Sequence, residues 1–404
     1  MQALTVTNAR VLTMTGAGAR RGAAMRELGV IERGFVTCEG GRIVAVGAGE
    51  APRGIGEVVD AGGRVCMPAL VDAHAHLCWG GDRWGEWEQV RAGVPYAQIL
   101  AAGGGILSTV RATRSASEAE LAEGVRMRLA AMARVGVGAT EAKSGYGLEP
   151  ETEARMLDAI ARAAAGSPVT VRRTFLGGHA VPPDDAAWPD RLAREVVPAF
   201  ARRFPDVAVD AFCERNALSV TQCRAVLEAA RTAGLAARLH TDQFTSLGGT
   251  EMAIEAGART VDHLEAATAE TVRAVGASGT IAVILPCSGY ALDGRYAPGR
   301  ALVDSGAAVA IGSNANPGSA PTVDLRFAMH LAVRHAGLSC AEAIVAATVN
   351  AAHALGLGDE LGRLEPGLRA NLIVLDERDE RSLVHAFGAP PPMHVVLGGE
   401  RLAT

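Results

Sequence analysis

The sequence predicts an α/β protein whose main part is a (β/α)₈ barrel, and two observations support this prediction. Eight short β-branched or apolar runs occur between about residues 67 and 354, each followed by a polar cluster and a stretch of helical periodicity. The two ends of the chain carry only short strand-like runs. We therefore expect an eight-stranded parallel barrel accompanied by a small β-domain.

The eight runs predict the barrel strands in chain order. Between them lie helical stretches such as 118–135 and 219–234, the second with Ser219 as a plausible N-cap. In such barrels the chemistry lies at the carboxyl ends of the strands, so functional residues are expected where the runs end. The runs occupy residues 71–77, 139–147, 169–180, 207–216, 235–244, 259–266, 280–288 and 309–319.

The chain ends predict one composite β-domain. Strand-like runs lie at 3–13, 41–49 and 64–69 in the first part, and at 370–377 and 394–403 in the last. Neither end alone has enough strands for an independent core, so we expect the two ends to pair. The alternative is two unrelated flanking modules.

Composition excludes several classes of protein. With 404 residues, 49% hydrophobic and 21% charged, the chain can bury a large core and is typical of a soluble enzyme. The net charge is −5 and Lys and Arg are scattered, so no nucleic-acid partner is expected. Seven cysteines form no CxxC pair, which favours a reducing cytoplasm over a disulfide-held secreted protein. No segment approaches ~18 uninterrupted apolar residues, so no membrane span is expected.

Histidines gather at the predicted catalytic ends of the strands. His74 and His76 close the first run, and i, i+2 spacing on a strand points both imidazoles to one face. His240 closes the fifth run, His263 closes the sixth, and His179 follows the third. An HxH pair alone is weak evidence, because structural pairs are at least as common, but this grouping favours a metal site over scattered caps and core histidines. Three imidazoles suit one Zn²⁺ or Fe²⁺ with a position open for water, and His74, His76 and His240 are the expected ligands.

Long motifs spread along the chain resemble those of known hydrolases. MPALVDAHAHL, the histidines of strands five and six and a polar residue after strand eight are similar to the amidohydrolase superfamily. That superfamily pairs its barrel with a β-sandwich built from both termini, which implies a sandwich from 1–66 and 355–404 and a barrel over 67–354. Further blocks, in order, resemble the imidazolonepropionase family: HAHLCWGGDR, AGGGILSTVRATR, EAKSGYGLE, GGHAVPP, LHTDQFTSLGG, VDHLEAAT, TIAVILP and NPGSAPT.

The resemblance implies an activity and a set of site residues. The implied activity is that of a cyclic amidohydrolase, acting on carbon–nitrogen bonds other than peptide bonds. It would open 4-imidazolone-5-propanoate to N-formimidoyl-L-glutamate in histidine degradation. The implied metal ligands are His74, His76, His240 and Asn314, and the implied catalytic residues are His263, Asn314 and Gln243. The implied substrate contacts are Arg83, Tyr146, His179, Gln243, His263, Asn316, Gly318 and Ser319.

The types of these residues suit such a substrate. A propionate carboxylate needs a fixed cation, and Arg83 offers a planar fork that the Tyr146 hydroxyl can support. A ring with N–H and C=O edges needs amide and imidazole partners such as Gln243, His179 and Asn316. The alternatives are a surface ion pair for Arg83 and turn formation for the others, since NPG is itself a turn former.

Glycines and tryptophans near the first strand need separate interpretation. Gly80, Gly81 and residues 103–105 lack the GxGxxG or GxxxxGK[ST] context, so a nucleotide site is not expected. Trp79, Trp84 and Trp87 are expected to pack in the core, with stacking on a substrate as the alternative.

Asn314 departs from the pattern that the resemblance implies. An aspartate there would bind the metal and accept a proton, whereas asparagine offers only a neutral carbonyl and an NH₂ group. His263 and Asp242 are the remaining candidates for proton transfer. Three explanations stay open: an engineered inactivating Asp→Asn change, a paralogue acting on a hydantoin or thiohydantoin propionate, and a protein that binds without turnover. A small cyclic amide is the expected partner, and a homodimer is compatible with the sequence.

Overall fold

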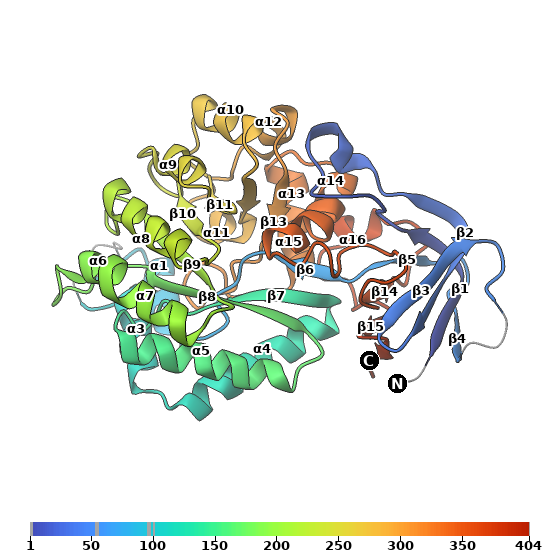
Figure 1. The fold of residues 1–404 in the computed structure, drawn as a ribbon, viewed down its shortest axis with the longest axis horizontal. Helices are drawn as coiled ribbons and strands as arrows, with labels where there is room; N and C mark the ends of the chain where they lie inside the picture. The colour runs from blue at the N-terminus through green and yellow to red at the C-terminus, as the bar shows by residue number, and fades with distance from the viewer. Residues whose placement is uncertain (1–2, 53–55, 95–97, 100–101, 404) are drawn as a thin grey trace.

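The computed structural model of the chain describes residues 3–52, 56–94, 98–99 and 102–403. Its strands form two eight-stranded sheets. One sheet forms a barrel surrounded by helices, and the other lies at one side of the molecule, where both chain ends are found (Figure 1).

The barrel strands follow one another in chain order, and all pair in parallel. Hydrogen bonds from Ala73 N to Ile311 O (3.3 Å) and from Asn314 N to His74 O (2.9 Å) join the last strand to the first. Every predicted run overlaps one strand, so the predicted barrel is confirmed. The strands are β6 (Leu70–Asp72), β7 (Val137–Lys143), β8 (Thr170–Gly178), β9 (Ala208–Cys213), β10 (Arg238–Thr241), β11 (Thr260–His263), β12 (Ile281–Ile284) and β13 (Val309–Ile311).

Helices occupy each connection between barrel strands. Ser219 caps its helix through a reciprocal pair of hydrogen bonds with Gln222, which confirms the predicted N-cap. The helices of these connections are α1 (Trp84–Arg91), α3 (Ile106–Ser115), α4 (Glu118–Arg134), α5 (Pro150–Ala165), α6 (Trp188–Arg191), a π-helical turn (Leu192–Val196), α7 (Val197–Arg203), α8 (Val220–Thr232), α9 (Gly249–Glu255), α10 (Ala269–Ala277), α11 (Pro286–Ala291) and α12 (Gly299–Asp304). After the last barrel strand follow α13 (Leu325–His335), α14 (Cys340–Ala346) and α15 (Val349–Ala354).

Barrel strands are buried on both faces, as expected for a parallel sheet covered by helices. Their side chains alternate between the helices and the barrel interior. On β10, Leu239 packs in the main apolar core, whereas Arg238 forms ion pairs with Glu141 of β7 and Asp262 of β11. The interior therefore holds charged side chains below the strand ends.

The second sheet is built from both ends of the chain. Its strand order is β16-β15-β14-β5-β1-β2-β3, with β4 paired to β1. Antiparallel pairing of β14 with β5, with Ile373 opposite Met67, joins the C-terminal strands to the N-terminal ones. The expected pairing of the ends is confirmed, and the alternative of unrelated modules is wrong. The strands are β1 (Leu4–Leu12), β2 (Val30–Glu39), β3 (Arg42–Ala48), β4 (Glu57–Asp60), β5 (Val65–Pro68), β14 (Leu372–Val374), β15 (His394–Leu397) and β16 (Glu400–Arg401).

Two short helices complete the elements, η1 (Gly22–Arg26) and α16 (Ser382–His385). The sequence did not predict strands β2 and β4. A division into 1–66 with 355–404 as one domain and 67–354 as the other stays a prediction.

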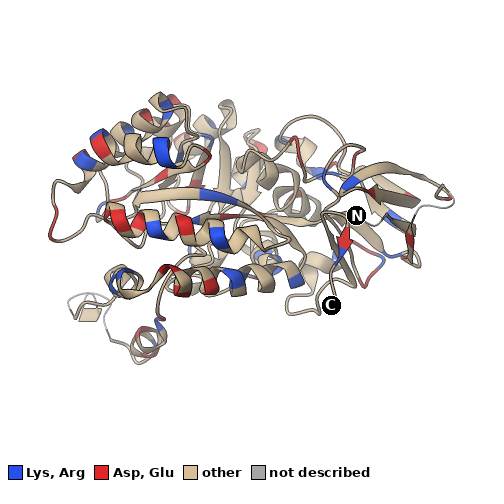
Figure 2. Ribbon diagram, turned by 60° about the horizontal axis from the view of Figure 1, so that its bottom comes forward, with Lys and Arg blue, Asp and Glu red and all other residues tan. Residues whose placement is uncertain are grey.

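Lys and Arg are interspersed with Asp and Glu along the helices (Figure 2). All seven cysteines are free thiols. Among the helices in the described ranges, none is long and apolar enough to cross a membrane.

The three tryptophans near the first barrel strand differ in burial. Trp79 packs against the core, and the Arg128 guanidinium lies 3.2 Å from its ring centroid. Trp84 and Trp87 are 78% and 66% exposed, because they lie on α1, which has no buried side chain. The prediction of core packing is therefore wrong for Trp84 and Trp87.

Candidate functional site

The first two histidines lie just beyond β6. This strand ends at Asp72, and the chain continues extended, with Ala75 bridging Ala315. Nε2 of His74 and Nε2 of His76 lie 3.2 Å apart, as the i, i+2 spacing predicts. The Asp72 carboxylate accepts hydrogen bonds from His74 N (3.2 Å) and Ser313 N (2.9 Å), and so ties the end of β6 to the end of β13.

His240 completes a cluster of three imidazoles. It lies on β10, and its Nε2 is 3.4 Å from Nε2 of His76. One ring nitrogen from each of His74, His76 and His240 lies within 4.8 Å of the other two, and all three side chains are buried. The structure thus brings the three predicted ligands together from two distant parts of the chain.

Two buried carboxylates determine which nitrogen of these rings carries hydrogen. Nδ1 of His74 lies 2.6 Å from Oδ2 of Asp262, and Nδ1 of His240 lies 3.0 Å from Oδ2 of Asp210. An ionised carboxylate only accepts hydrogen bonds, so the Asp262 contact puts the hydrogen of His74 on Nδ1, and the 3.0 Å approach of Asp210 favours the same tautomer of His240. Burial lowers the pKa of His74 and His240, so both rings are neutral and their Nε2 atoms present lone pairs.

The facing nitrogens fit a metal ion. His76 can donate a hydrogen bond to only one of its two neighbours, so at least two lone pairs converge without a hydrogen between them. Nitrogens about 2.0–2.1 Å from a tetrahedral Zn²⁺ lie about 3.3–3.4 Å apart, which agrees with the 3.2 and 3.4 Å separations here. A divalent cation would turn this repulsive arrangement into an attractive one.

Asn314 lies beside this cluster, with its backbone N donating to His74 O (2.9 Å). It is buried, and within the described ranges neither Oδ1 nor Nδ2 has a hydrogen-bond partner. An unsatisfied buried amide is costly, and coordination of a cation by Oδ1 would satisfy one of its two groups. The residue therefore fits the position of a fourth ligand, but it has no basic atom to accept a proton.

Three strand ends at this face adopt the left-handed backbone conformation. The φ angles are +52° at Asp242, +89° at His263 and +56° at Asn314. Non-glycine residues with positive φ are uncommon and cluster at functional sites. Their position supports the carboxyl ends of β10, β11 and β13 as the functional face.

His263 and Asp242 have different surroundings. The ring centroid of His263 lies 5.4 Å from that of His240, and its Nδ1 lies 3.1 Å from Oε1 of Glu265. Asp242 instead accepts a hydrogen bond from the Thr250 hydroxyl (2.7 Å) in α9. Of the two proton-transfer candidates, only His263 is shown beside the histidine cluster.

His179 and Tyr146 extend the cluster to one side. The His179 ring stacks on His76 at 5.0 Å, and its Nδ1 lies 3.0 Å from Gly145 O. Burial lowers the pKa of His179 to about 3, so this ring is neutral. Tyr146 lies 5.2 Å from His179 between ring centroids, and burial raises the pKa of its hydroxyl.

Glu153 positions the loop that carries Tyr146. From α5, its carboxylate accepts hydrogen bonds from the backbone N of Gly145 (2.8 Å), Gly147 (2.7 Å) and Leu148 (2.9 Å). Glu153 was not predicted from the sequence. The pattern that could have predicted it is a glutamate in the first turn of a helix directly after a glycine-rich loop, because backbone N–H groups there need acceptors.

Arg83 lies against the loop after β13. Its Nε and Nη2 donate to Oε2 of Glu86 (3.0 and 2.5 Å), and its side chain is only 16% exposed. A Cβ added at Gly318 would lie 2.2 Å from Nη1 of Arg83, so any larger residue there would displace the end of the Arg83 side chain. Glu86, which was not predicted from the sequence, also accepts from Gly105 N (3.0 Å).

Asn316 uses its side chain within the NPGS turn. Oδ1 accepts from the backbone N of Gly318 (2.8 Å) and Ser319 (2.7 Å), while Nδ2 donates to Asn314 O (2.6 Å) and Ser319 Oγ (3.0 Å). These four hydrogen bonds are those of a turn former, which was the alternative interpretation for this residue. Gln243, after β10, donates to Ser288 Oγ (3.2 Å) of α11.

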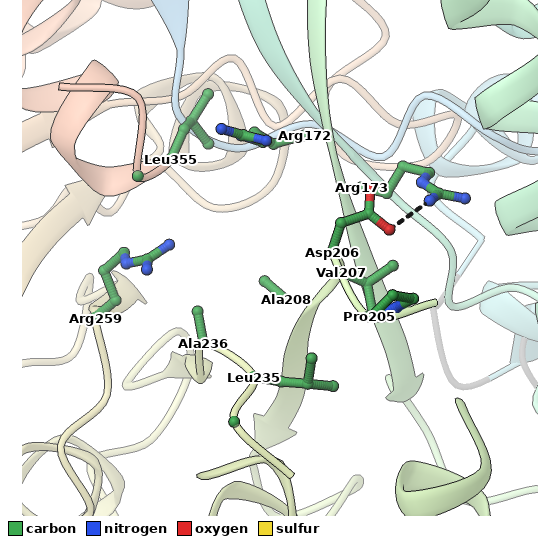
Figure 3. A pocket seen from close by; sticks show the side chains of 12 residues that line it. Arg172, Arg173, Pro205, Asp206, Val207, Ala208, Leu235, Ala236, Arg259 and Leu355 are labelled. Carbon is green, nitrogen blue, oxygen red and sulfur yellow. Dashed lines mark hydrogen bonds and ion pairs between the residues drawn. The ribbon is translucent and has the colours of Figure 1, made fainter. Parts of the chain in front are cut away.

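A separate hollow lies at the opposite end of the barrel. Figure 3 shows Arg172, Arg173 and Arg259 around it, near the starts of β8 and β11, with Arg173 paired to Asp206 at 2.7 Å. None of the predicted site residues lines this hollow. The chemistry-bearing residues are therefore at the carboxyl ends of the strands.

Comparison with known proteins assigns the family. The sequence model of the amidohydrolase family matches residues 65–402. This chain belongs to the amidohydrolase family. It is a metal-dependent hydrolase of carbon–nitrogen bonds.

Several relatives of this amidohydrolase are similar along almost their whole length. An imidazolonepropionase of Chloroflexus aggregans is 44% identical over 404 residues, covering 96% of this chain and 95% of the relative. The imidazolonepropionase of Deinococcus radiodurans is 45% identical over 387 residues, covering 95% and 96%.

Solved structures share the architecture. A triazine hydrolase variant has a TM-score of 0.75 at 17% identity, covering 100% of this chain and 95% of the other. A 5-methylcytosine deaminase from Klebsiella pneumoniae has a TM-score of 0.74 at 16% identity, covering 99% and 98%. At such identities the likeness shows the fold alone.

Proposed function

We propose that this amidohydrolase opens the ring of 4-imidazolone-5-propanoate to give N-formimidoyl-L-glutamate, a step of histidine degradation. The observation that carries the proposal is the convergence of three buried imidazoles, two of them in contact with a buried carboxylate, in a chain 44–45% identical to proteins named imidazolonepropionase. The seven free thiols support a cytoplasmic location.

One divalent metal, Zn²⁺ or Fe²⁺, would be held by His74, His76, His240 and Oδ1 of Asn314. Such a metal supplies an activated water and polarises the bond that is attacked. The buried, neutral state of the three rings supports this ligand set, because only an unprotonated imidazole binds a metal.

His263 is the residue that moves a proton. Its Nδ1 is engaged by Glu265, so its Nε2 is the atom free to accept one, and the Glu265 carboxylate stabilises the imidazolium that forms. Asn314 cannot accept a proton, and its role is to hold the metal through its carbonyl oxygen. Gln243, held by Ser288, presents its amide to the ring of the substrate.

Arg83 binds the propionate through Nη1. Its Nε and Nη2 are already bonded to Glu86, so Nη1, which lies against Gly318, remains for the substrate. Tyr146 lies close enough for the Arg83 charge to lower the pKa of its buried hydroxyl, against the larger effect of burial. His179 and the loop of Asn316, Gly318 and Ser319 complete the walls around the ring.

Substrate comparison tests the proposal. The protein loaded with Zn²⁺ or Fe²⁺ is assayed with fresh imidazolonepropionate and with hydantoin propionate, following the loss of ring absorbance. Faster turnover of imidazolonepropionate is expected. Faster turnover of the hydantoin would instead identify the paralogue that Asn314 also permits, and binding without turnover of either ring would identify a silent form.

A further inference from the structure

Charged side chains are buried in the barrel directly below the histidines. Glu141 and Lys143 come from β7, Asp210 from β9, Arg238 from β10 and Asp262 from β11, and all are almost fully buried. We name these five residues the ionic cluster. Burying five charges is expensive, so the cluster needs a purpose or a full set of partners.

Ion pairs connect every member of the ionic cluster. Nζ of Lys143 lies 2.6 Å from Oδ2 of Asp210, 2.8 Å from Oε2 of Glu141 and 3.9 Å from Oδ2 of Asp262. Arg238 contributes Nη2 to Oδ2 of Asp262 (2.8 Å) and Nε at 3.3 Å from Oε1 of Glu141. The side chains of Lys143 and Arg238 are therefore already ion-paired with the carboxylates of the ionic cluster.

This pairing explains a second group of potential metal ligands. His74, Glu141 and Asp262 also lie close enough together to hold an ion. Because Arg238 and Lys143 contact both of these carboxylates, the second group is a charge network rather than another metal centre.

The two carboxylates that contact the metal-binding rings differ in the cations that pair with them. Oδ2 of Asp262 meets both Nδ1 of His74 (2.6 Å) and Nη2 of Arg238 (2.8 Å). Oδ2 of Asp210 meets Nδ1 of His240 (3.0 Å) and Nζ of Lys143 (2.6 Å). Lys143 is the only cation of the ionic cluster in contact with Asp210, whereas Asp262 also has Arg238.

We propose that Lys143 is a positioning residue of the metal site, which holds Asp210 so that Asp210 fixes the tautomer and ring orientation of His240. The proposal deepens the proposed function and rests on its metal site. Without the ammonium, Asp210 would be a buried carboxylate lacking a cation, free to turn away from Nδ1 of His240. His240 would then lose the acceptor that keeps its Nε2 lone pair toward the metal. Partners of this kind typically change metal affinity 10–100-fold.

The test measures metal binding without substrate, so it does not depend on which ring the enzyme opens. Lys143→Met keeps the length of the side chain and removes its charge. Zn²⁺ affinity is measured by competition with a chromogenic chelator, and the Co²⁺-loaded protein gives a visible spectrum that reports the ligand geometry. We expect Zn²⁺ affinity to fall about 10–100-fold and the Co²⁺ bands to shift.

Two further variants make the test decisive. Asp210→Asn removes the same contact from the other side, and should reproduce the loss of affinity if Lys143→Met folds poorly. Glu342→Gln is the matched control, because Glu342 is a buried carboxylate with two arginine partners, Arg26 (3.0 Å) and Arg300 (2.8 Å), outside the ionic cluster. It should lower stability while leaving Zn²⁺ affinity and the Co²⁺ spectrum unchanged.

Wild-type Zn²⁺ affinity and an unchanged Co²⁺ spectrum in folded Lys143→Met or Asp210→Asn would overturn the proposal. A loss of affinity of equal size in Glu342→Gln would also overturn it, because the effect would then be general destabilisation. If the wild-type protein binds Zn²⁺ tightly but does not hydrolyse imidazolonepropionate, the proposed function fails while the role of Lys143 stands.

Discussion

Replacing Asn314 by aspartate tests the most unusual position of the site. Oδ1 and Nδ2 of Asn314 have no hydrogen-bond partner in the described part of the chain, so the change breaks no hydrogen bond found there. The backbone φ of +56° is one that Asp tolerates nearly as well as Asn. The two side chains have the same shape, so Asn314→Asp changes charge and basicity with little change in packing.

Turnover of imidazolonepropionate should rise in Asn314→Asp. A positioned general base contributes typically ~10²–10⁴-fold, which corresponds to about 3–5 kcal/mol of activation free energy. KM should stay nearly the same, because Arg83, which binds the propionate in the proposed function, is not altered. Both proteins are assayed after loading with the same metal, so that a difference in kcat does not reflect a difference in metal content.

The same variant should depend more strongly on its metal for stability. A buried carboxylate without a cation costs several kcal/mol, and Asn314 is almost fully buried. Thermal unfolding with and without a chelator should therefore show a larger fall in Tm for Asn314→Asp than for wild type. Asn371→Asp is the control, because Asn371 is buried outside the barrel strands, where its side chain bonds Gly138 O and Gly398 N.

Equal and brisk turnover in wild type and Asn314→Asp would refute the reasoning, because an aspartate at position 314 would then add no useful proton acceptor to the one that His263 supplies. A lower activity of the variant on every ring tested would indicate chemistry adapted to a neutral amide. A matching gain in Asn371→Asp would show that the effect is not local to the site.

Four further predictions concern the metal content, Arg83, Gly318 and Glu342. Protein purified without chelator should contain about one Zn or Fe per chain by elemental analysis, and a metal-free protein would contradict the ligand set. Arg83→Lys should weaken propionate binding by about 1.5–3 kcal/mol, because an ammonium cannot pair with Glu86 through two planar nitrogens and still present a third nitrogen to the propionate, and an unchanged KM would place Arg83 outside the site. Gly318→Ala should raise KM in the same assay, since its Cβ would lie 2.2 Å from Nη1 of Arg83 and would displace that end of the side chain. Gly279→Ala is the control, because the added Cβ meets nothing within 4 Å and φ, as at Gly318, is outside the left-handed region. Burial acts to raise the pKa of Glu342, but hydrogen bonds from Ser339, Arg300 and Arg26 lower it to about 2. The ionised carboxylate therefore stabilises the fold at any pH above the ordinary pKa of a glutamate. This contribution is lost as pH falls from that ordinary value toward the lowered pKa of the folded protein. The difference in unfolding free energy between wild type and Glu342→Gln, measured in urea, should therefore shrink from pH 5 to pH 3, and a constant difference would contradict the assignment.

The barrel and three of its metal-binding candidates could be predicted because their signals are local. An apolar run followed by a polar cluster predicts a strand and its carboxyl end, and every predicted run overlaps a barrel strand. The barrel rule then places His74, His76 and His240 at one face without any knowledge of the distances between them. Ser219 was predicted in the same way, since a cap depends on residues three positions away.

Predictions failed where burial depends on distant neighbours. Trp84 and Trp87 were expected in the core because of their apolar character, but α1 presents them to solvent. Strand β2 was missed because polar residues interrupt its apolar run (VIERGFVTCE), and only pairing with β1 and β3 defines it. The substrate role of Asn316 stays a prediction, and the structure adds that its side chain is hydrogen-bonded within its own turn.

The sequence by itself determined the order of the strands, the face at which the chemistry lies and the identity of the histidines, because each of these follows from periodicity or spacing over a few residues. Only the tertiary structure decided how those histidines are held. Asp262 meets His74 across 188 positions of sequence, and Lys143 meets Asp210 across 67. Spacing in the chain carries no information about such pairs, since each forms only when strands from different parts of the chain curve round to face the same interior. A charged residue inside an apolar strand run signals that a partner exists, and closure of the barrel decides which partner it is.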